Sequence, residues 1–375
     1  MSALFKKFLQ EATRLTRNGS LQEATRAIQQ ALGRMTPHPP TPPAAKQSHA
    51  DRDVIDVEAR PVHKAAPQPV SEPVRPLHTP VEPASNDGPG EFTEATFTHA
   101  GTTRSYKLYT PPHAIAQPAH PLPLVLMLHG CTQNPDDFAV GTGMNALALE
   151  HGFVVVYPAQ NASANPQRCW NWFTPADQQR DTGEAAWLAA LVHEVTRLRA
   201  IDPARVYVAG LSAGGAMASI LGHTHPDVFA AVGVHSGLAC GVASNVITAL
   251  SVMKNGRSVA GAASNVPTIV FHGDADATVH PHNADAVLQT AIGQATTTAK
   301  VTEGTNDKVA QGQSYTRTTY TTADGSSIAE NWNLHGAGHA WSGGSPKGSY
   351  TDPLGPDASA EMWRFFTEHA RATAH

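Results

Sequence analysis

A serine at position 212 stands in a pattern that can turn its hydroxyl into a nucleophile. Gly210-Leu211-Ser212-Ala213-Gly214 has the form G-x-S-x-G, which in hydrolytic enzymes marks a sharp turn from a strand into a helix. The apolar run Val206–Ala209 predicts the strand, and the small residues after Ala213 predict a closely packed helix. This context favours a nucleophile over an ordinary Gly/Ser turn.

A serine hydroxyl needs a base, and the base needs an acid that orients it. After this kind of turn the acid comes next along the chain and the histidine last. Asp274 and Asp276 both follow the apolar run Pro267–Phe271; the residues alone leave the choice open, with a preference for Asp276. Among the later histidines, His335 ends a predicted strand and is typical of a structural residue. His339 lies in a glycine-rich loop and is the predicted base.

The oxyanion formed during attack on a carbonyl needs two backbone N–H donors. The residue after the nucleophile, Ala213, supplies one. The other comes from the loop after an early strand. Here the run Leu124–Leu128 leads into His129-Gly130-Cys131-Thr132-Gln133, and Cys131 is the predicted donor. His129-Gly130 also fits a simple turn at the end of a strand.

Tryptophans in predicted loops are candidates for binding substrate. Trp170, Trp172 and Trp341 could line an apolar groove for ester chains or sugar rings, although packing in the core explains Trp170 and Trp172 equally well. The pairs His223-Thr224-His225 and His280-Pro281-His282 have no matching ligands nearby, so we expect no metal site and no cofactor.

The elements that must position these residues alternate between strands and helices, which predicts a mostly parallel sheet covered by helices on both faces. A hairpin is expected first, and long apolar runs indicate strands buried on both faces. The remaining predicted strands and helices, beyond those named above, are Phe92–Thr98, Thr103–Tyr109, Phe153–Tyr157, Glu184–Arg199, Ala230–Val234, Asn283–Ile292, Tyr315–Thr322, Ile328–Leu334 and Ser359–Ala372. This body spans 91–375, and its stretch Gly237–Asn265 is expected to shape the rim of the site.

Two further segments precede the body. Residues 1–34 show helical spacing of apolar residues and an excess of basic ones, which predicts a helical module of two amphipathic helices. They have no uninterrupted apolar core of a secretory signal, so we expect a cytoplasmic protein. Residues 35–90 are rich in proline and contain no Phe, Tyr or Trp, which predicts a disordered linker.

Composition narrows the function classes. The chain has 375 residues and a formal net charge of −5, which disfavours a nucleic-acid binder. Three cysteines are too few for a disulfide scaffold. No apolar run approaches the roughly 18 residues of a transmembrane segment.

Four motifs together resemble the catalytic domain of poly(3-hydroxybutyrate) depolymerase-type esterases: the loop 129–133, the segment 168–173, the serine motif 210–215 and the loop 338–344. The resemblance implies an α/β-hydrolase fold and carboxylester hydrolysis, with Ser212 as nucleophile, Asp276 as acid and His339 as base. It also implies that Cys131 and Cys169 can pair, whereas a cytosolic protein would usually keep them reduced.

Secreted members of that family carry an export signal and a domain that binds crystalline polymer. This sequence is instead similar to depolymerases that act inside the cell on amorphous granules, where residues 1–34 could attach to the granule surface, dock on the body or self-associate. Two other classes stay open. One is a feruloyl, acetylxylan or general short-chain esterase, and the other is a granule-binding protein without catalysis.

Overall fold

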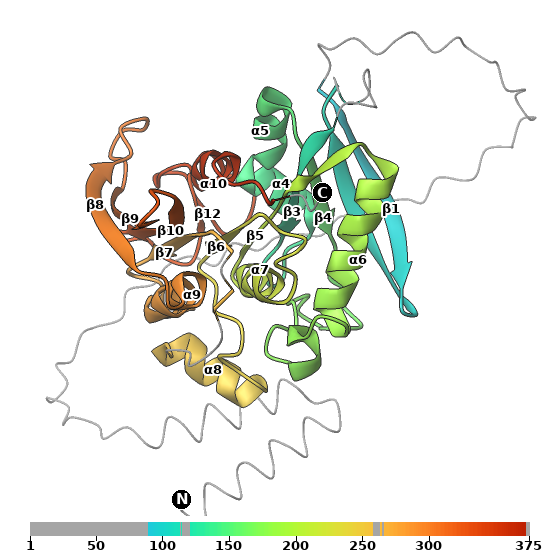
Figure 1. The fold of residues 1–375 in the computed structure, drawn as a ribbon, viewed down its shortest axis with the longest axis horizontal. Helices are drawn as coiled ribbons and strands as arrows, with labels where there is room; N and C mark the ends of the chain where they lie inside the picture. Colours follow the sequence, from blue (N-terminus) through green and yellow to red (C-terminus); the bar gives the residue numbers. More distant parts are fainter. Residues whose placement is uncertain (1–88, 113, 115–120, 258–262, 265, 373–375) are drawn as a thin grey trace, which may run out of the picture. The chain divides into compact units, whose positions relative to one another are not determined.

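The computed structural model describes residues 89–112, 114, 121–257, 263–264 and 266–372. The helical module predicted for 1–34, and the linker predicted for 35–90 except its last two residues, lie outside the described residues. The described part is built on a ten-stranded sheet with helices on both faces (Figure 1). The predicted α/β-hydrolase architecture is therefore confirmed.

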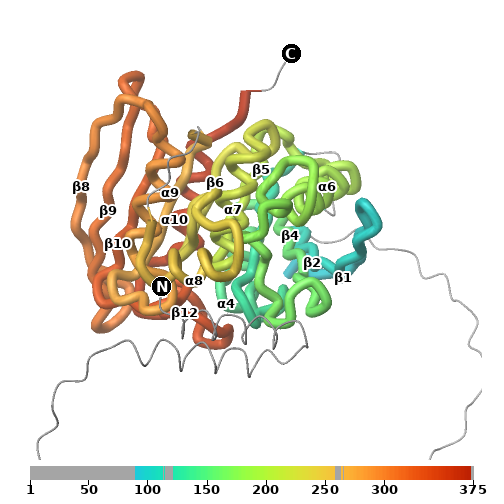
Figure 2. The backbone as a smooth tube through the Cα atoms, turned by 90° about the horizontal axis from the view of Figure 1, so that it is seen from below, coloured from blue at the N-terminus to red at the C-terminus, as the bar shows by residue number. Residues whose placement is uncertain are grey.

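The sheet has the strand order β1-β2-β4-β3-β5-β6-β7-β10-β9-β8. From β4 to β10 its neighbours are parallel, and antiparallel strands flank this central part. Strands β1 and β8 lie at opposite ends of the sheet (Figure 2). In chain order the strands are β1 (Glu91–His99), β2 (Thr102–Thr110), β3 (Leu122–Leu128), β4 (Val154–Pro158), β5 (Ile201–Leu211), β6 (Ala231–His235), β7 (Thr268–Gly273), β8 (Thr297–Thr305), β9 (Ser314–Thr322) and β10 (Ser327–Leu334).

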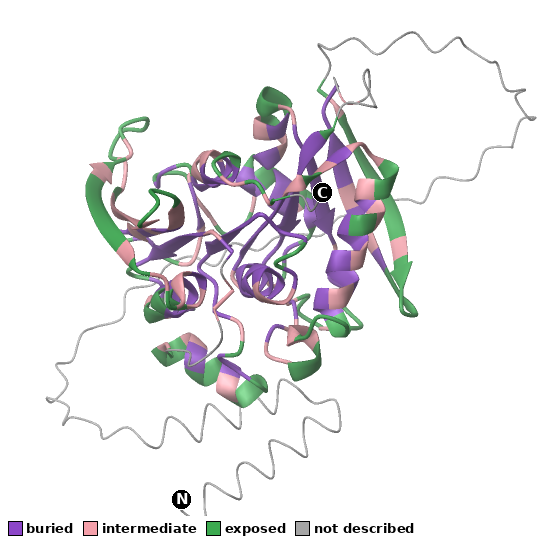
Figure 3. Ribbon diagram, in the orientation of Figure 1, coloured by how far each residue is buried: buried purple, intermediate pink, exposed green. Residues whose placement is uncertain are grey.

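Helices cover both faces of this sheet. Alternate residues of β3 show the two cores: Leu124 and Leu126 pack in the cluster that contains α6, α7 and α9, whereas Val125 and Met127 pack in the cluster that contains α4, α5 and α10. All four are fully buried, as are the central strands in general (Figure 3). The helices are α4 (Pro135–Thr142), α5 (Met144–His151), α6 (Gly183–Leu198), α7 (Ala213–Thr224), α8 (Val246–Asn255), α9 (His282–Ile292) and α10 (Ala358–Thr367). The described residues also form a 3₁₀ turn, Pro175–Gln178, and a small pair of strands, β11 (Trp341–Ser342) and β12 (Thr351–Asp352).

Some elements differ from the sequence-based expectation. Strand β8 was not expected, because its sequence TTAKVTEGT is polar and mostly exposed, so it lacks the apolar signal of a buried strand. Helix α8 lies within the stretch 237–265 that was expected only to form a rim. Helix α10 ends at Thr367 rather than at Ala372. Among the described residues, no helix is both long and apolar enough to cross a membrane.

The parallel strands bring the predicted site residues to one edge of the sheet. Strands β3, β5, β7 and β10 run in the same direction, and they end at Leu128, Leu211, Gly273 and Leu334. The loops that follow these four ends carry the predicted oxyanion donors, nucleophile, acid and base. In open α/β sheets this carboxyl edge is where ligands bind.

Candidate active site

The serine motif forms the expected turn between β5 and α7. Ser212 has φ 57° and ψ −119°, a left-handed conformation that is rare for residues other than glycine. Its N–H donates to the carbonyl oxygen of His235 at 2.9 Å. A Cβ atom on Gly214 would collide with the carbonyl oxygen of Leu128. Close backbone packing thus explains the glycine and holds Ser212 at the end of its strand.

Asp276 and His339 meet across the loops that follow β7 and β10. The Nδ1 atom of His339 lies 2.7 Å from Oδ2 of Asp276. The other carboxylate oxygen, Oδ1, accepts N–H bonds from Thr278 and Val279, each at 2.8 Å. The Asp276 side chain has no exposed surface, and that of His339 is 12% exposed. The acid is thus fully held by its partners, whereas the imidazole reaches the surface.

The charge of Asp276 is stabilised despite its burial. Burial by itself would raise the pKa of the carboxyl group, but the hydrogen bond and positive charge available from His339 and the N–H of Val279 hold the pKa below its ordinary value. His272 lies nearby, with Nε2 3.5 Å from Oδ2 of Asp276. Asp276 is therefore a carboxylate at neutral pH.

Asp274, the alternative acid, pairs with the alternative histidine. Its Oδ2 lies 3.0 Å from Nδ1 of His335, and its Oδ1 accepts the N–H of Gly336 at 2.7 Å. Nε2 of His335 is hydrogen-bonded to Oγ1 of Thr316 at 2.8 Å. Both nitrogens of His335 thus have partners, whereas Nε2 of His339 meets none in the described part of the chain.

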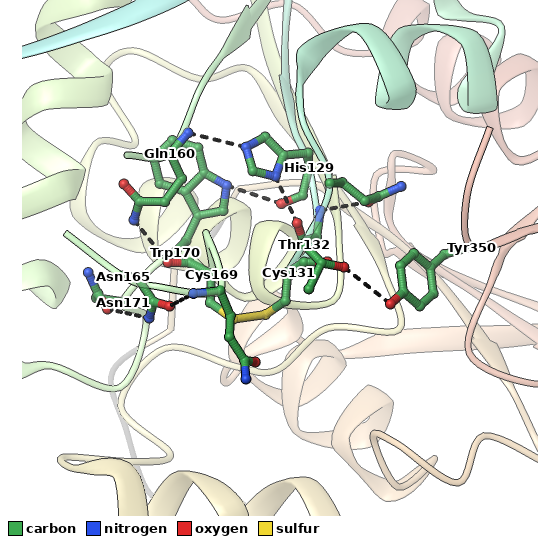
Figure 4. The surroundings of a disulfide bond; sticks show 12 residues. His129, Cys131, Thr132, Gln160, Asn165, Cys169, Trp170, Asn171 and Tyr350 are labelled. Atoms are coloured by element: carbon green, nitrogen blue, oxygen red, sulfur yellow. Dashed lines mark hydrogen bonds between the residues drawn. A yellow bond between two sulfur atoms is a disulfide. The ribbon is translucent and has the colours of Figure 1, made fainter. Parts of the chain in front are cut away.

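The predicted oxyanion donors lie at the ends of two neighbouring strands. Within the described ranges, the N–H groups of Cys131 and Ala213 donate to no protein acceptor. Cys131 forms a disulfide with Cys169, with 4.2 Å between the two Cα atoms (Figure 4). The loop after β3 is thereby joined covalently to the segment before Trp170.

The three tryptophans do not line a groove, which corrects the expectation that they bind substrate. Trp170, Trp172 and Trp341 are 0%, 5% and 1% exposed. The indole N–H of Trp170 donates to the carbonyl of His129, and that of Trp341 donates to Oγ of Ser359. They shape the site only by supporting its loops, because buried rings give a substrate nothing to contact.

One residue that the sequence analysis overlooked links two of these loops. His235 is fully buried at the end of β6; its carbonyl accepts the N–H of Ser212, and its Nε2 accepts the N–H of Ser342 at 3.0 Å. Burial, with the positive charge that His272 and His339 can carry, holds the pKa of His235 well below its ordinary value. The sequence feature that could have identified His235 is its place directly after the apolar run Ala230–Val234.

In the residues that the structure describes, no group of three or more His, Cys, Asp or Glu side chains is arranged to hold a metal ion. The site consists of a serine, an imidazole, a carboxylate and free amides. Such a set suits nucleophilic acyl transfer.

Comparison with known proteins agrees with this chemistry. A model of the esterase PHB depolymerase family matches residues 104–308, more than half of the chain. The chain belongs to this family. The span that matches the family model runs from β2 to just beyond β8. It includes Ser212 and Asp276 and ends before His339.

Two curated relatives and one solved structure show the extent of the similarity. The chain is 34% identical over 236 residues to poly(3-hydroxyalkanoate) depolymerase C of Paucimonas lemoignei, covering 58% of this chain and 54% of that protein. It is 30% identical over 295 residues to poly(3-hydroxybutyrate) depolymerase of Ralstonia pickettii, covering 72% and 58%. The chain thus spans little more than half the length of either protein. An acetyl xylan esterase from Aspergillus awamori shares the fold, with a TM-score of 0.55, 18% identity and coverage of 74% and 99%.

Proposed function

We propose that this chain hydrolyses ester bonds of poly(3-hydroxybutyrate) or its oligomers through Ser212, His339 and Asp276. The observation that carries the proposal is the pairing of buried Asp276 with His339 at 2.7 Å, on the sheet edge where Ser212 caps α7. Membership of the esterase PHB depolymerase family and the names of the two relatives support the substrate.

In the first half of the reaction Ser212 attacks the ester carbonyl carbon. His339 accepts the hydroxyl proton at Nε2, the nitrogen that has no partner among the described residues. Asp276 holds the proton on Nδ1 and stabilises the imidazolium that forms. The same proton then passes to the leaving alkoxide, which departs as the hydroxyl end of the shortened polymer, and the acyl group remains on the serine.

The amides of Cys131 and Ala213 stabilise the oxyanion of the tetrahedral intermediate. Preorganised N–H donors are effective there because they need no rearrangement as the charge develops. In the second half of the reaction His339 takes a proton from water, which attacks the acyl-enzyme. When the C–O bond to Ser212 breaks, His339 returns this proton to the serine oxygen. The products are a carboxylic acid and the free Ser212 hydroxyl.

The deciding experiment measures hydroxybutyrate or its oligomers released from amorphous poly(3-hydroxybutyrate) granules by the full chain. Ser212→Ala is the matched control, since it removes only the hydroxyl. We expect release by the unaltered chain and a loss of more than about 1000-fold in the variant. Activity retained by Ser212→Ala would refute the nucleophile.

Parallel assays with p-nitrophenyl butyrate and with feruloyl and acetylxylan esters separate the alternatives. If the chain cleaves these esters but leaves the granules intact, the proposed roles of the three residues stand. The substrate is then a small or plant-derived ester rather than the polymer. Failure of a serine-reactive fluorophosphonate to label the folded chain at Ser212 would favour a granule-binding protein without catalysis.

We further propose that residues 1–34 attach the protein to polymer granules. Their basic, amphipathic pattern suits the surface of an apolar granule. A chain beginning at residue 89 should cleave p-nitrophenyl butyrate at the rate of the full chain but sediment less with granules. Equal sedimentation of both chains would refute the attachment.

A further inference from the structure

The peptide unit between Gly130 and Cys131 has both of its polar ends in use. Its N–H, on Cys131, is the oxyanion donor of the proposed mechanism. Its C=O, on Gly130, lies 2.7 Å from Nδ1 of His129. In a trans peptide the C=O and the N–H point in opposite directions from one rigid plane. A group that fixes the carbonyl therefore fixes the direction of the N–H as well.

The surroundings of His129 decide which ring nitrogen carries the proton. The backbone N–H of Gln160 points at Nε2 of His129 with an N···N distance of 3.2 Å (Figure 4). A backbone amide can only donate, so Nε2 must accept. In the neutral ring the proton is then on Nδ1, where it can be donated to the carbonyl of Gly130.

The ring is neutral and cannot turn freely. His129 is 1% exposed. Burial, only partly opposed by the hydrogen bond to Gly130, lowers the pKa of His129 to about 4. The indole N–H of Trp170 donates to the carbonyl of His129 at 3.1 Å and so fixes its backbone. The imidazole therefore keeps one tautomer and one orientation at neutral pH.

A buried polar cluster holds Gln160, the residue that sets this tautomer. Its Oε1 accepts from Nη1 of Arg104 at 2.7 Å, and its Nε2 donates to the carbonyl of Cys169 at 2.9 Å and to Glu184. Arg104, Gln160 and Glu184 are each at most 5% exposed. Because Cys169 is bonded to Cys131, the cluster supports the loop after β3 by a covalent route as well.

We infer that His129 is a positioning residue: as the Nδ1–H tautomer set by Gln160, it clamps the Gly130–Cys131 peptide with its N–H directed toward the oxyanion. The inference rests on the proposed function, because it concerns the second oxyanion donor of that mechanism. His129 does not itself touch the substrate.

Two substitutions separate this role from simple packing. His129→Asn places an amide nitrogen where Nδ1 stands and keeps the donor to Gly130, while it loses the acceptor for Gln160. His129→Gln places an oxygen where Nε2 stands and keeps that acceptor, while it loses the donor to Gly130. Each variant loses one of two buried hydrogen bonds, so both should lose similar thermal stability.

The readouts are kcat and KM for p-nitrophenyl butyrate and the inhibition constant of butylboronic acid, which forms a tetrahedral adduct with a serine nucleophile. For His129→Gln we expect kcat to fall roughly 10- to 100-fold with little change in KM, and boronate affinity to fall in parallel. For His129→Asn we expect kcat within about threefold of the unaltered chain. Equal losses in both variants, or no loss in either, would overturn the inference.

Failure of the proposed function and failure of the His129 clamp give different results. If the unaltered chain neither hydrolyses the ester nor binds the boronate, the proposed function fails before His129 is tested. A second measurement needs no substitution and so covers variants that do not fold: the imidazole ¹⁵N spectrum of the full chain at pH 7. We expect one slowly exchanging ring proton on Nδ1 for His129, and a proton on Nε2 would refute the clamp.

Discussion

Two aspartate–histidine pairs join the same two loops, and they differ in what their surroundings allow. Asp276 with His339 and Asp274 with His335 both connect the loop after β7 to the loop after β10, at 2.7 Å and 3.0 Å. The Asp276 side chain has no exposed surface, whereas those of Asp274 and His335 are 41% and 39% exposed. Both histidines use Nδ1 toward the acid, so the difference lies in burial and in the second nitrogen.

The second imidazole nitrogen distinguishes the pair that we propose for catalysis from the other pair. Nε2 of His335 is occupied by Thr316, so that ring has no site at which to take a proton from a serine. Nε2 of His339 has no protein partner among the described residues. Burial matters too, because a charge interaction away from water is screened less and orients an imidazole more firmly. An Asp–His contact alone therefore does not identify a catalytic pair.

The largest test of this comparison is Asp276→Asn set against Asp274→Asn. The amide keeps the size of the buried acid but removes the charge and favours the wrong tautomer of His339. We expect kcat for p-nitrophenyl butyrate to fall about 1000- to 10,000-fold in Asp276→Asn and less than about fivefold in Asp274→Asn. Similar losses of kcat in the two variants would show that the two aspartate–histidine pairs do not differ in their importance for catalysis.

The buried acid Asp276 should also make the stability of the fold depend on pH. Because the pKa of Asp276 lies below its ordinary value of 3.8 in the folded chain, the carboxylate stabilises the fold at pH values above that, and this contribution is lost as the pH falls through the folded pKa. Urea unfolding midpoints measured between pH 5 and pH 2 should therefore decline more steeply for the unaltered chain than for Asp276→Asn. Parallel curves would contradict the linkage.

The smallest expected effect concerns the exposed pair. A double-mutant cycle of Asp274→Asn and His335→Gln, read by urea unfolding at pH 7, should give a coupling energy of about 0.2–1 kcal/mol, because water screens partly exposed pairs. The Gly336 N–H bond to Asp274 and the Ala275 N–H bond to the Ala337 carbonyl keep the loops together without it. A coupling above about 2 kcal/mol would make this pair a major tie between the loops.

The sequence could predict the parts that follow from chain direction and local pattern. The strand–turn–helix at Ser212 is local, and the placement of Ser212, Asp276 and His339 at one edge of the sheet follows from parallel strands that end there. Choosing Asp276 over Asp274 requires the three-dimensional structure. Their difference depends on the depth at which each side chain sits and on Thr316, which lies on an antiparallel strand remote from the motif.

Three-dimensional burial also explains what was missed. The sequence predicts loops at Trp170 and Trp341, and loop aromatics suggest contact with a ligand. The fold instead turns both rings inward, where they donate hydrogen bonds to His129 and Ser359. The clamp formed by His129 and Gln160 joins residues from the ends of two different strands. No spacing rule connects them, because their contact arises only when β3 and β4 pair.

The backbone of Ser212 makes activity and durability opposing selective pressures on this chain. Its φ of 57° suits glycine better than any residue with a Cβ. Holding a serine there costs on the order of 1 kcal/mol or more. A laboratory evolution that rewarded heat resistance alone would be expected to replace Ser212 by glycine. A screen that also demanded ester cleavage would be expected to keep the serine, at the cost of the stability that glycine would add at this position.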